Sequence, residues 1–435
     1  MQPISRETII ARPFYLKQLR DRAWNGQIKV VTGIRRCGKS FLLNRLYRDA
    51  LVAEGVKADD IRCISLDERR NLALRNPLSL ADEIDKWMDG FSGRRYLFID
   101  EIQFCEPTPN PFVPGGRPVT FYDALNELLH DDRMDVYVTG SNSRMLSEDI
   151  LTEFRGRGDE IRVHPLCFAE YLSAVGGDKL DAFSDYTRFG GMPFSLFRTD
   201  ATAKETYLKS LFAEVYIKDI VERRRIARPE LLGKIVDFLA SSVGSLTNPT
   251  NIAHALSAQG VQASVHTVAS YIAHVKEAFL FSEARRYDIK GRSYFSFPDK
   301  FYCEDLGLRN ARLSFRQPEI THLMENAVYN ELVRRGFSVD VGVVVASGRN
   351  AHGASVKIPH EIDFVVNKGG ERVYVQSAYA IRSEEKLESE RRAFSLAGDS
   401  FRKIIVRDDI LHRTFDERGV LHVNLIDFLL DETIV

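Results

Sequence analysis

The sequence predicts an α/β protein whose first domain contains a doubly wound parallel sheet. Short apolar runs alternate with longer helical patterns between about residues 25 and 165, and each apolar run ends where polar residues begin. The chain has 435 residues, enough for several domains. Since ligands of open parallel sheets bind at the carboxyl ends of the strands, functional side chains are expected there. The expected strands are Ile28 to Thr32, Ile61 to Leu66, Tyr96 to Ile99 and Asp135 to Thr139.

Composition limits the classes of partner and the compartment. Lys and Arg total 60 and Asp and Glu total 61, so a basic surface for nucleic acid would have to be local. The five cysteines form no CxxC pair, which favours a reduced scaffold without structural metal. The N-terminus lacks the pattern of an export signal, and no apolar stretch reaches the length of a membrane span. We therefore expect a cytoplasmic protein without membrane contact.

A glycine-rich loop follows the first expected strand. Residues 33 to 40 read GIRRCGKS and match GxxxxGK[ST] between the strand IKVVT and the helical pattern FLLNRLYRDAL. The glycines let backbone N–H groups face a polyphosphate, Lys39 reaches the β- and γ-phosphates, and the Ser40 hydroxyl ligates Mg²⁺. The alternative, an ordinary glycine turn, does not use all the fixed positions. The residues expected to bind ATP are Gly33, Arg35, Arg36, Cys37, Gly38, Lys39, Ser40 and Phe41.

An acidic pair follows the third expected strand, in the sequence YLFIDE. Asp100 is expected to hold the hydrated Mg²⁺, and Glu101 to polarise the attacking water. An Asp-Glu pair alone more often belongs to a solvated loop. At the end of a buried strand, in a chain with a phosphate loop, it predicts ATP hydrolysis as well as binding.

Polar residues after the fourth strand supply further candidates. Ser141 or Asn142 could orient the lytic water or contact the γ-phosphate, although either could simply cap a helix. Arg155 and Arg157 could stabilise transition-state charge on the nucleotide of a neighbouring subunit. That role requires an oligomer, and the alternative is a pair of surface arginines.

The chain downstream divides into further segments. Residues 166–228 look helical, with a break at Gly190, and suit a lid. A winged helix-turn-helix is expected over residues 229–300, with a β-wing formed by Phe279 to Arg286 and Ser293 to Phe297. Its helices are predicted at Gly233 to Ser242, Pro249 to Ala258 and Ser264 to Ala278. A Pro- and Gly-rich insertion at residues 105–118 could be a lid or a substrate-facing loop.

The winged segment could bind DNA. A recognition helix with polar side chains and a basic wing suits a duplex, because arginines hold phosphates while the helix meets base edges. Winged domains also bind proteins, and both interpretations stay open. The candidate residues are His266, Thr267, Ser270 and His274 on the third helix, and Arg285, Arg286, Lys290 and Arg292 in the wing.

These motifs together resemble the AAA+-related P-loop ATPases with an AAA-type core, a winged helix and an uncharacterised nuclease-like C-terminal domain. The matching stretches are GIRRCGKS, YLFIDEIQ, VTGSNS, GRGDEIRVHPLCFAEYL, FGGMPF and VYIKDIVERRRI. The resemblance implies an AAA-type core over residues 1–165 and a homo-oligomer, in one form a hexameric ring. It also implies Ser141 or Asn142 as sensor, Arg155 or Arg157 as arginine finger, and Arg12 and Tyr15 near the adenine.

The last domain, residues 301–435, resembles the PD-(D/E)xK nuclease fold. Glu325 and Asp363 match its helix acid and strand acid. Where the fold has ExK, this chain has Gln376-Ser377-Ala378, which lacks both the carboxylate and the lysine. We therefore expect an inactive domain that is structural or holds nucleic acid.

Three functions remain in view. The first is Mg²⁺-dependent ATP hydrolysis by an oligomeric AAA-type ATPase coupled to DNA binding or remodelling. The second is a nucleotide-controlled switch that grips a protein partner. The third is an ATP-regulated nuclease.

Overall fold

Two compact units make up the chain. The computed structural model describes residues 5, 8–129, 131–140, 158–296, 298–316, 319–349 and 355–435. The N-terminal unit comprises residues 9–164 together with 277–279, and the C-terminal unit comprises residues 165–276 and 280–435 together with the described residues 5 and 8. Within the described residues, no helix is long and apolar enough to cross a membrane.

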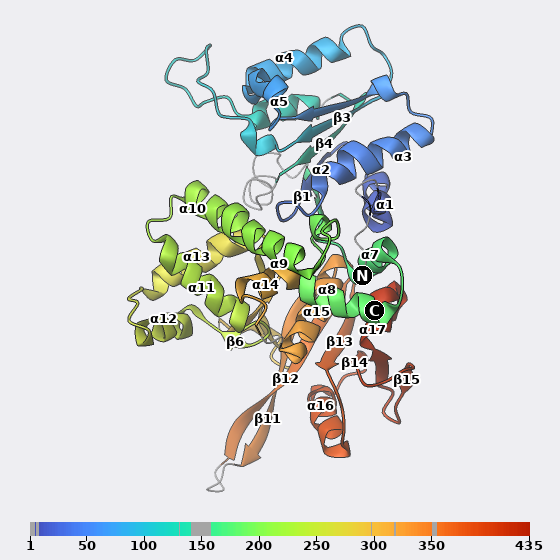
Figure 1. The fold of residues 1–435 in the computed structure, drawn as a ribbon, viewed down its shortest axis with the longest axis vertical. Coiled ribbons are helices and arrows are strands. Elements are labelled where there is room, and N and C mark those ends of the chain that lie inside the picture. Colours follow the sequence, from blue (N-terminus) through green and yellow to red (C-terminus); the bar gives the residue numbers. More distant parts are fainter. Residues whose placement is uncertain are drawn as a thin grey trace. The chain divides into compact units, whose positions relative to one another are not determined.

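A five-stranded parallel sheet forms the centre of the N-terminal unit (Figure 1). Its order is β2-β3-β4-β1-β5, which places β1 between β4 and β5. This confirms the predicted parallel α/β sheet and brings the ends of β1, β3 and β4 to one edge. The strands are β1 (Ile28–Thr32), β2 (Ile61–Ser65), β3 (Arg95–Asp100), β4 (Met134–Thr139) and β5 (Gly158–Arg162).

The two faces of this sheet bury different side chains, because successive residues of a strand point to opposite faces. Leu97 and Ile99 of β3 join an apolar cluster with α4 (Pro77–Met88) and α5 (Phe121–Leu128). On the other face, the Phe98 ring stacks on Tyr47, with ring centroids 5.7 Å apart. Tyr47 ends a π-helical stretch, residues 42–47, between α2 (Lys39–Phe41) and α3 (Arg48–Ala53). α1 (Pro13–Asp21) contacts this stretch.

The C-terminal unit begins with helices, as predicted for residues 166–228. The Gly190-Gly191 turn breaks them where Asp305 accepts hydrogen bonds from the N–H groups of Gly191, at 2.6 Å, and Leu308, at 2.9 Å. A Cβ atom at Gly190 would lie 2.2 Å from an Asp305 oxygen, so the turn leaves no room for a side chain. The helices are α7 (Phe168–Val175), α8 (Lys179–Phe189), α9 (Ala201–Ser210) and α10 (Lys218–Arg224).

Three helices and a small sheet follow, and we call residues 229–303 the three-helix segment. All three predicted helices are present, and the first begins four residues earlier than expected from Gly233: α11 (Pro229–Ser241), α12 (Pro249–Ala258) and α13 (Val265–Glu277). The sheet has the antiparallel order β6-β10-β7. Its strands are β6 (Leu246–Thr247), β7 (Phe281–Ala284) and β10 (Asp299–Cys303).

The predicted wing is wrong in its second strand. Ser293–Tyr294 forms β9, which pairs with β8 (Arg286–Asp288) in a different, eight-stranded sheet. The partner that draws β8 into that sheet is β11 (Ser338–Arg349), which lies far along the chain. Local sequence patterns cannot identify such a partner.

The eight-stranded sheet is mixed and has the order β15-β16-β14-β13-β12-β11-β8-β9. β12 pairs antiparallel with β11 and β13, while β13, β14 and β16 run parallel. The remaining strands are β12 (Ser355–Lys368), β13 (Glu371–Ala378), β14 (Arg402–Arg407), β15 (Thr414–Phe415) and β16 (Leu421–Asn424). The helices of this part are α14 (Leu306–Arg312), α15 (Ile320–Arg334), α16 (Glu384–Ala397) and α17 (Leu425–Leu430).

Candidate functional site

The glycine-rich loop curls between β1 and α2, at the carboxyl end of β1. Gly33 and Gly38 have φ angles of +135° and +104°, a region that glycine adopts without steric penalty. A Cβ atom at Gly33 would lie 2.1 Å from the Val163 carbonyl oxygen, so the loop approaches the chain after β5 too closely for any side chain. Cys37 Sγ also contacts this carbonyl, at 3.3 Å.

Lys39 lies inside the curve of the loop. Its ammonium donates hydrogen bonds to the carbonyl oxygens of Gly33, at 2.9 Å, and Ile34, at 3.1 Å, and the residue is 4% exposed. A buried ammonium needs such partners, because desolvating a charge is costly. The loop therefore holds a positive charge at its centre, as phosphate recognition requires.

The acidic pair at the end of β3 is tied to β4 by one hydroxyl. Thr139 Oγ1 donates to Asp100 Oδ1 at 2.5 Å and accepts from the Glu101 N–H at 2.9 Å. The Ser40 hydroxyl also hydrogen-bonds to Asp100. Burial raises the pKa of Asp100, and the hydrogen bonds from Thr139 and Ser40 oppose the rise. Ser40 and Asp100 thus come together, and both offer the oxygen ligands that Mg²⁺ prefers.

Glu101 adopts a left-handed backbone conformation, with φ +55°, which is uncommon for a residue other than glycine. Gln103, on the short 3₁₀ helix Ile102–Phe104, donates its amide N–H to the Glu101 carboxylate. The two neighbouring carboxylates therefore have separate partners: Asp100 faces Thr139 and Ser40, and Glu101 faces Gln103.

Arg12 and Tyr15 hold the loop against the chain after β5. The Arg12 guanidinium donates to the carbonyl oxygens of Cys37, at 3.1 Å, and His164, at 2.9 Å, and the Tyr15 hydroxyl accepts from the His164 N–H at 3.1 Å. Tyr15 is fully buried and Arg12 is 3% exposed. Their contact with an adenine stays a prediction.

The other residues predicted to bind nucleotide in the N-terminal unit differ in their exposure to solvent. Arg36 and Phe41 are exposed, and Arg35 is half-buried. The predicted sensor residues Ser141 and Asn142 and the predicted finger residues Arg155 and Arg157 lie outside the described residues.

Sequence reasoning missed Thr139 and Gln103. Thr139 is the last residue of β4, so its proximity to Asp100 follows only once β3 and β4 are known to be neighbours. Gln103 carries a local signal, because it stands two residues after Glu101 in the sequence DEIQ.

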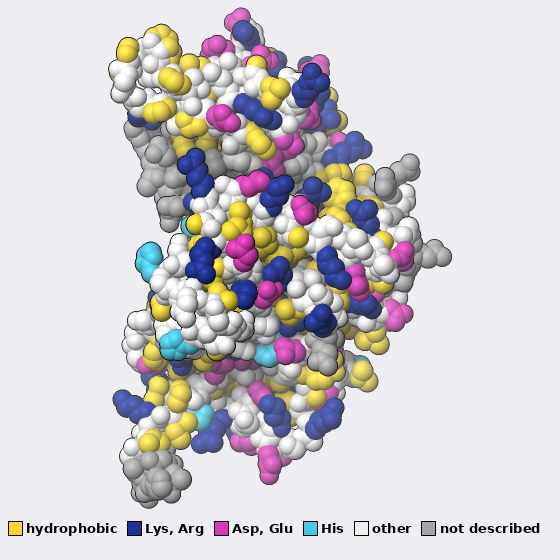
Figure 2. Space-filling model, turned by 60° about the vertical axis from the view of Figure 1, so that its left-hand side comes forward, with side chains coloured by type: hydrophobic (Ala, Val, Ile, Leu, Met, Phe, Trp, Pro, Cys, Tyr) yellow, Lys and Arg dark blue, Asp and Glu magenta, His cyan; other side chains and the backbone are white. Residues whose placement is uncertain are grey.

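The residues predicted to meet DNA lie on α13 and in the segment that runs from the end of β7 to β9. His266, on α13, is exposed, and Ser270 Oγ lies 3.4 Å from His274 Nε2 on the same helix. Arg285, Lys290 and Arg292 are exposed in the β7–β9 region, and Arg286 is half-buried on β8. The face drawn in Figure 2 carries Lys and Arg side chains interspersed with Asp and Glu, so a basic surface there would be small.

Glu325 and Asp363, the two acids predicted to match a nuclease fold, both lie beside Lys300, which the sequence motifs do not single out. Lys300 Nζ, from β10, lies 2.9 Å from Glu325 Oε1 on α15 and 3.7 Å from Asp363 Oδ1 on β12. Glu361 Oε1, also on β12, is 2.7 Å from the same nitrogen. The Tyr302 hydroxyl donates to Glu325 Oε1 at 2.7 Å. We call these five side chains the Lys300 centre.

Burial and neighbouring charges shift the pKa values of Asp363 and Lys300 in this centre. Burial, with the nearby Glu325 carboxylate, raises the pKa of Asp363 to about 8. Burial alone would lower the pKa of Lys300, but the three carboxylates outweigh it and raise that pKa. From the mismatched QSA stretch, Gln376 Oε1 accepts from the Asp363 N–H at 3.2 Å, and the Ser377 N–H donates to Asp363 Oδ2 at 2.9 Å.

The parallel sheet, the glycine-rich loop and the acidic end of β3 define an AAA-type P-loop ATPase. A family model described as an AAA domain matches residues 25–172, and one described as a domain of unknown function matches residues 180–319. An uncharacterized protein of Haemophilus influenzae is 32% identical over 429 residues, which cover 98% of this chain and 99% of that protein. The chain therefore belongs to the AAA+-related family of P-loop ATPases.

Two further similarities are more distant. An uncharacterized protein of Methanocaldococcus jannaschii is 25% identical over 389 residues, which cover 85% of this chain and 78% of that protein. The structure of a Walker-type ATPase of Pyrococcus abyssi aligns with 72% of this chain and 98% of its own, at 15% identity and a TM-score of 0.49.

Proposed function

We propose that this chain binds ATP with Mg²⁺ in the glycine-rich loop and hydrolyses it. The observation that carries the proposal is the hydrogen-bonded group formed by Ser40, Asp100, Thr139 and Glu101 at the ends of neighbouring strands. It gathers a hydroxyl, a carboxylate and a second carboxylate beside a loop that already contains a buried ammonium. Phosphoryl transfer needs these groups and little other covalent chemistry.

Each side chain has a distinct role in this proposal. Lys39 exchanges its two loop carbonyls for phosphate oxygens. Ser40 and Asp100 would hold Mg²⁺, which would neutralise charge on the phosphates. Glu101 polarises the attacking water. Thr139 is a positioning residue, because its hydroxyl binds the Asp100 carboxylate and the backbone N–H of Glu101. Gln103 restrains the Glu101 carboxylate until water and nucleotide are present.

We further propose that the site is completed by assembly. Ser141 or Asn142 would act as sensor, and Arg155 or Arg157 would reach the nucleotide of a neighbouring copy in a homo-oligomer. DNA would bind through the three-helix segment, where exposed Arg285 and Lys290 can hold phosphates. ATP turnover would then be coupled to DNA binding or remodelling.

The central test compares ATP turnover of the natural protein, Glu101→Gln and Glu106→Gln. Glu106 is an exposed carboxylate five positions away and serves as the matched control. Glu101→Gln should bind ATP with similar affinity. It should hydrolyse ATP at least about 100-fold more slowly, because an amide cannot accept a proton from the attacking water. Glu106→Gln should behave like the natural protein. Equal turnover in all three proteins would refute the role of Glu101.

The DNA and oligomer proposals need separate measurements. Turnover is measured with duplex, single-stranded and branched DNA at increasing salt, alongside native mass with and without ATP. Stimulation that falls steeply with salt would support DNA coupling, since each phosphate contact releases counterions. No stimulation by any DNA, together with ATP-dependent assembly and slow turnover, would support a nucleotide-controlled switch instead.

A further inference from the structure

The C-terminal unit contains a charged centre that the proposed ATPase site does not use. Three carboxylates, from Glu325, Glu361 and Asp363, converge on the single ammonium of Lys300. We propose that Lys300 acts as a built-in cation that occupies the place of a divalent metal ion and closes this acid centre to metal. The three carboxylates then serve as a latch between two sheets, and the domain does not cut nucleic acid by a metal-dependent route.

Distances and burial support a fixed cation. The Lys300 side chain is 5% exposed, and two carboxylate oxygens lie 2.7 and 2.9 Å from its nitrogen, within the range of charge-assisted hydrogen bonds. Asp363 and Glu325 are 10% and 14% exposed, so water screens the group weakly. A magnesium ion needs its oxygen ligands at about 2.0 to 2.1 Å, and the ammonium stands between these oxygens. A second cation at the same place would also be repelled by Lys300.

The centre has more acidic groups than cations. Three carboxyl groups face one ammonium, and Tyr302 contributes only a neutral hydroxyl to Glu325. The raised pKa of Asp363 means that this carboxyl group takes up a proton in place of a second cation. Removal of Lys300 would therefore leave Glu325 and Asp363, which are 14% and 10% exposed, and the 33% exposed Glu361 without their cation. A divalent cation can replace the ammonium and displace the proton of Asp363, because oxygen ligands are the ones it prefers. This is why we expect the acid centre to gain affinity for metal when the lysine is replaced.

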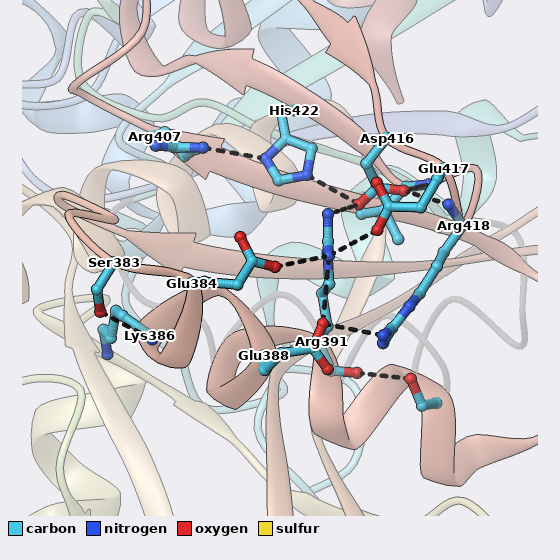
Figure 3. Close-up of polar contacts among 12 residues, drawn as sticks. Ser383, Glu384, Lys386, Glu388, Arg391, Arg407, Asp416, Glu417, Arg418 and His422 are labelled. Atoms are coloured by element: carbon cyan, nitrogen blue, oxygen red, sulfur yellow. Dashed lines mark hydrogen bonds and ion pairs between the residues drawn. The ribbon is translucent and has the colours of Figure 1, made fainter.

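A second buried cation in the same unit serves as a comparison, because its loss is not expected to create a metal site. Arg391 on α16 contacts Asp416, Glu417, Glu388 and Glu384, as Figure 3 shows. Asp416 is 7% exposed but also contacts His422 Nε2 at 3.1 Å, whereas Glu417 and Glu384 are 72% and 76% exposed, so water can solvate them when the arginine is lost. Replacing Arg391 should therefore create no metal site.

Lys300 also connects parts of the chain that are distant in sequence. Its strand, β10, pairs with β6 and β7 of the three-helix segment. Its acidic partners lie on α15 and on β12 of the eight-stranded sheet. The ion pairs therefore fasten the three-helix segment to the nuclease-like fold, which gives Glu325 and Asp363 a structural role.

The test measures Mn²⁺ binding to the full-length, nucleotide-free protein by electron paramagnetic resonance. The variants are Lys300→Met, which keeps the length of the side chain, Lys300→Met combined with Asp363→Asn, and Arg391→Met as control. Lys300→Met should bind one Mn²⁺ at the acid centre, with an affinity more than about tenfold higher than that of the natural protein at the same place. The double variant should lose that gain, and Arg391→Met should show none. Absence of a gain in Lys300→Met would overturn the proposal.

Two further measurements test the proposal even if Lys300→Met folds poorly. Its melting temperature is recorded with and without Mn²⁺, and it should rise with metal, whereas that of the double variant should not. An unchanged melting temperature would contradict the proposal. Asp363→Asn alone is compared with the natural protein, and a Mn²⁺ site in the natural protein that this substitution removes would also overturn it. None of these readouts depends on ATP turnover.

Discussion

At the scale of single residues, one carbonyl oxygen makes glycine necessary at position 33. The Val163 oxygen lies 2.1 Å from where a Cβ atom would stand, and it belongs to the backbone, so it cannot rotate away. Gly26 provides a matched comparison, because it also has positive φ, at +73°, but has no atom within 4 Å of its Cβ position. The two positions also differ in backbone strain, because φ +135° at Gly33 lies outside the left-handed region that other residues can adopt, whereas φ +73° at Gly26 lies close to it.

We expect Gly33→Ala to lower the free energy of unfolding by more than about 3 kcal/mol, because the loop must move away from Val163. Gly26→Ala should lower it by only about 1 to 2 kcal/mol, the penalty of the left-handed backbone alone. Urea unfolding of the nucleotide-free proteins measures both values. Equal losses would mean that the loop does not approach Val163 as closely as the structure shows.

Sequence alone indicated those candidate residues whose arrangement is local. The spacing of Gly33, Gly38, Lys39 and Ser40 encodes the phosphate loop within eight positions. Thr139 and Lys300 could not be found in this way, because each acts on a carboxylate that the fold brings from another strand or helix. Side-chain pairing across a sheet depends on strand order, which no local pattern supplies.

At the scale of elements, Asp305 joins the turn after α8 to the start of α14. Its carboxylate accepts backbone hydrogen bonds from both, and burial raises the pKa of Asp305 to about 6. An unfolded aspartate titrates near pH 3.9, so between about pH 4 and 6 the folded protein binds more protons than the unfolded chain. Stability should therefore fall as the pH rises through this window and then level off.

The pH dependence is checked by urea unfolding, followed by circular dichroism, at pH values from 4 to 7. Asp305→Asn should lose the part of the slope that Asp305 contributes, because the amide does not titrate. The variant should also be less stable at pH 7 by about 1 to 3 kcal/mol, since its NH₂ group cannot accept the N–H of Gly191. The same slope in both proteins would contradict the assignment to Asp305.

The elements themselves were predicted with unequal success, for a physical reason. The first four strands of the N-terminal sheet are bounded by turns and filled with buried apolar residues, so their position follows from local pattern. The sequence pattern also predicts a helix from Glu319 to Gly336, and the structure places α15 at Ile320–Arg334. The strand Ser293–Tyr294 was recognised as extended, but its sheet was not, because β8 and β11 lie far apart in sequence.

At the scale of the whole molecule, the shared strands bear on where the chain can be divided. The predicted boundary at residue 300 separates β8 and β9 from β11, to which β8 is paired, and it also separates Lys300 from its acids. A fragment of residues 301–435 would expose the edge of β11. Exposed strand edges promote aggregation because their N–H and C=O groups are unpaired.

We therefore expect the fragment 301–435 to aggregate, while the fragment 165–435, cut where the compact units divide, stays monodisperse. Light scattering after purification distinguishes the two outcomes. A monodisperse, folded fragment 301–435 would show that the β8–β11 ladder is dispensable and would favour the boundary predicted at residue 300.

The junction between β7 and β8 has a mechanical consequence. β7 ends at Ala284 in one sheet and β8 begins at Arg286 in the other, so a single residue, Arg285, links them. One residue spans at most about 3.6 Å, which leaves almost no covalent slack. Neither sheet can then be displaced far without pulling the other. Force applied to nucleic acid or protein held by the three-helix segment would therefore be transmitted through Arg285 to the eight-stranded sheet.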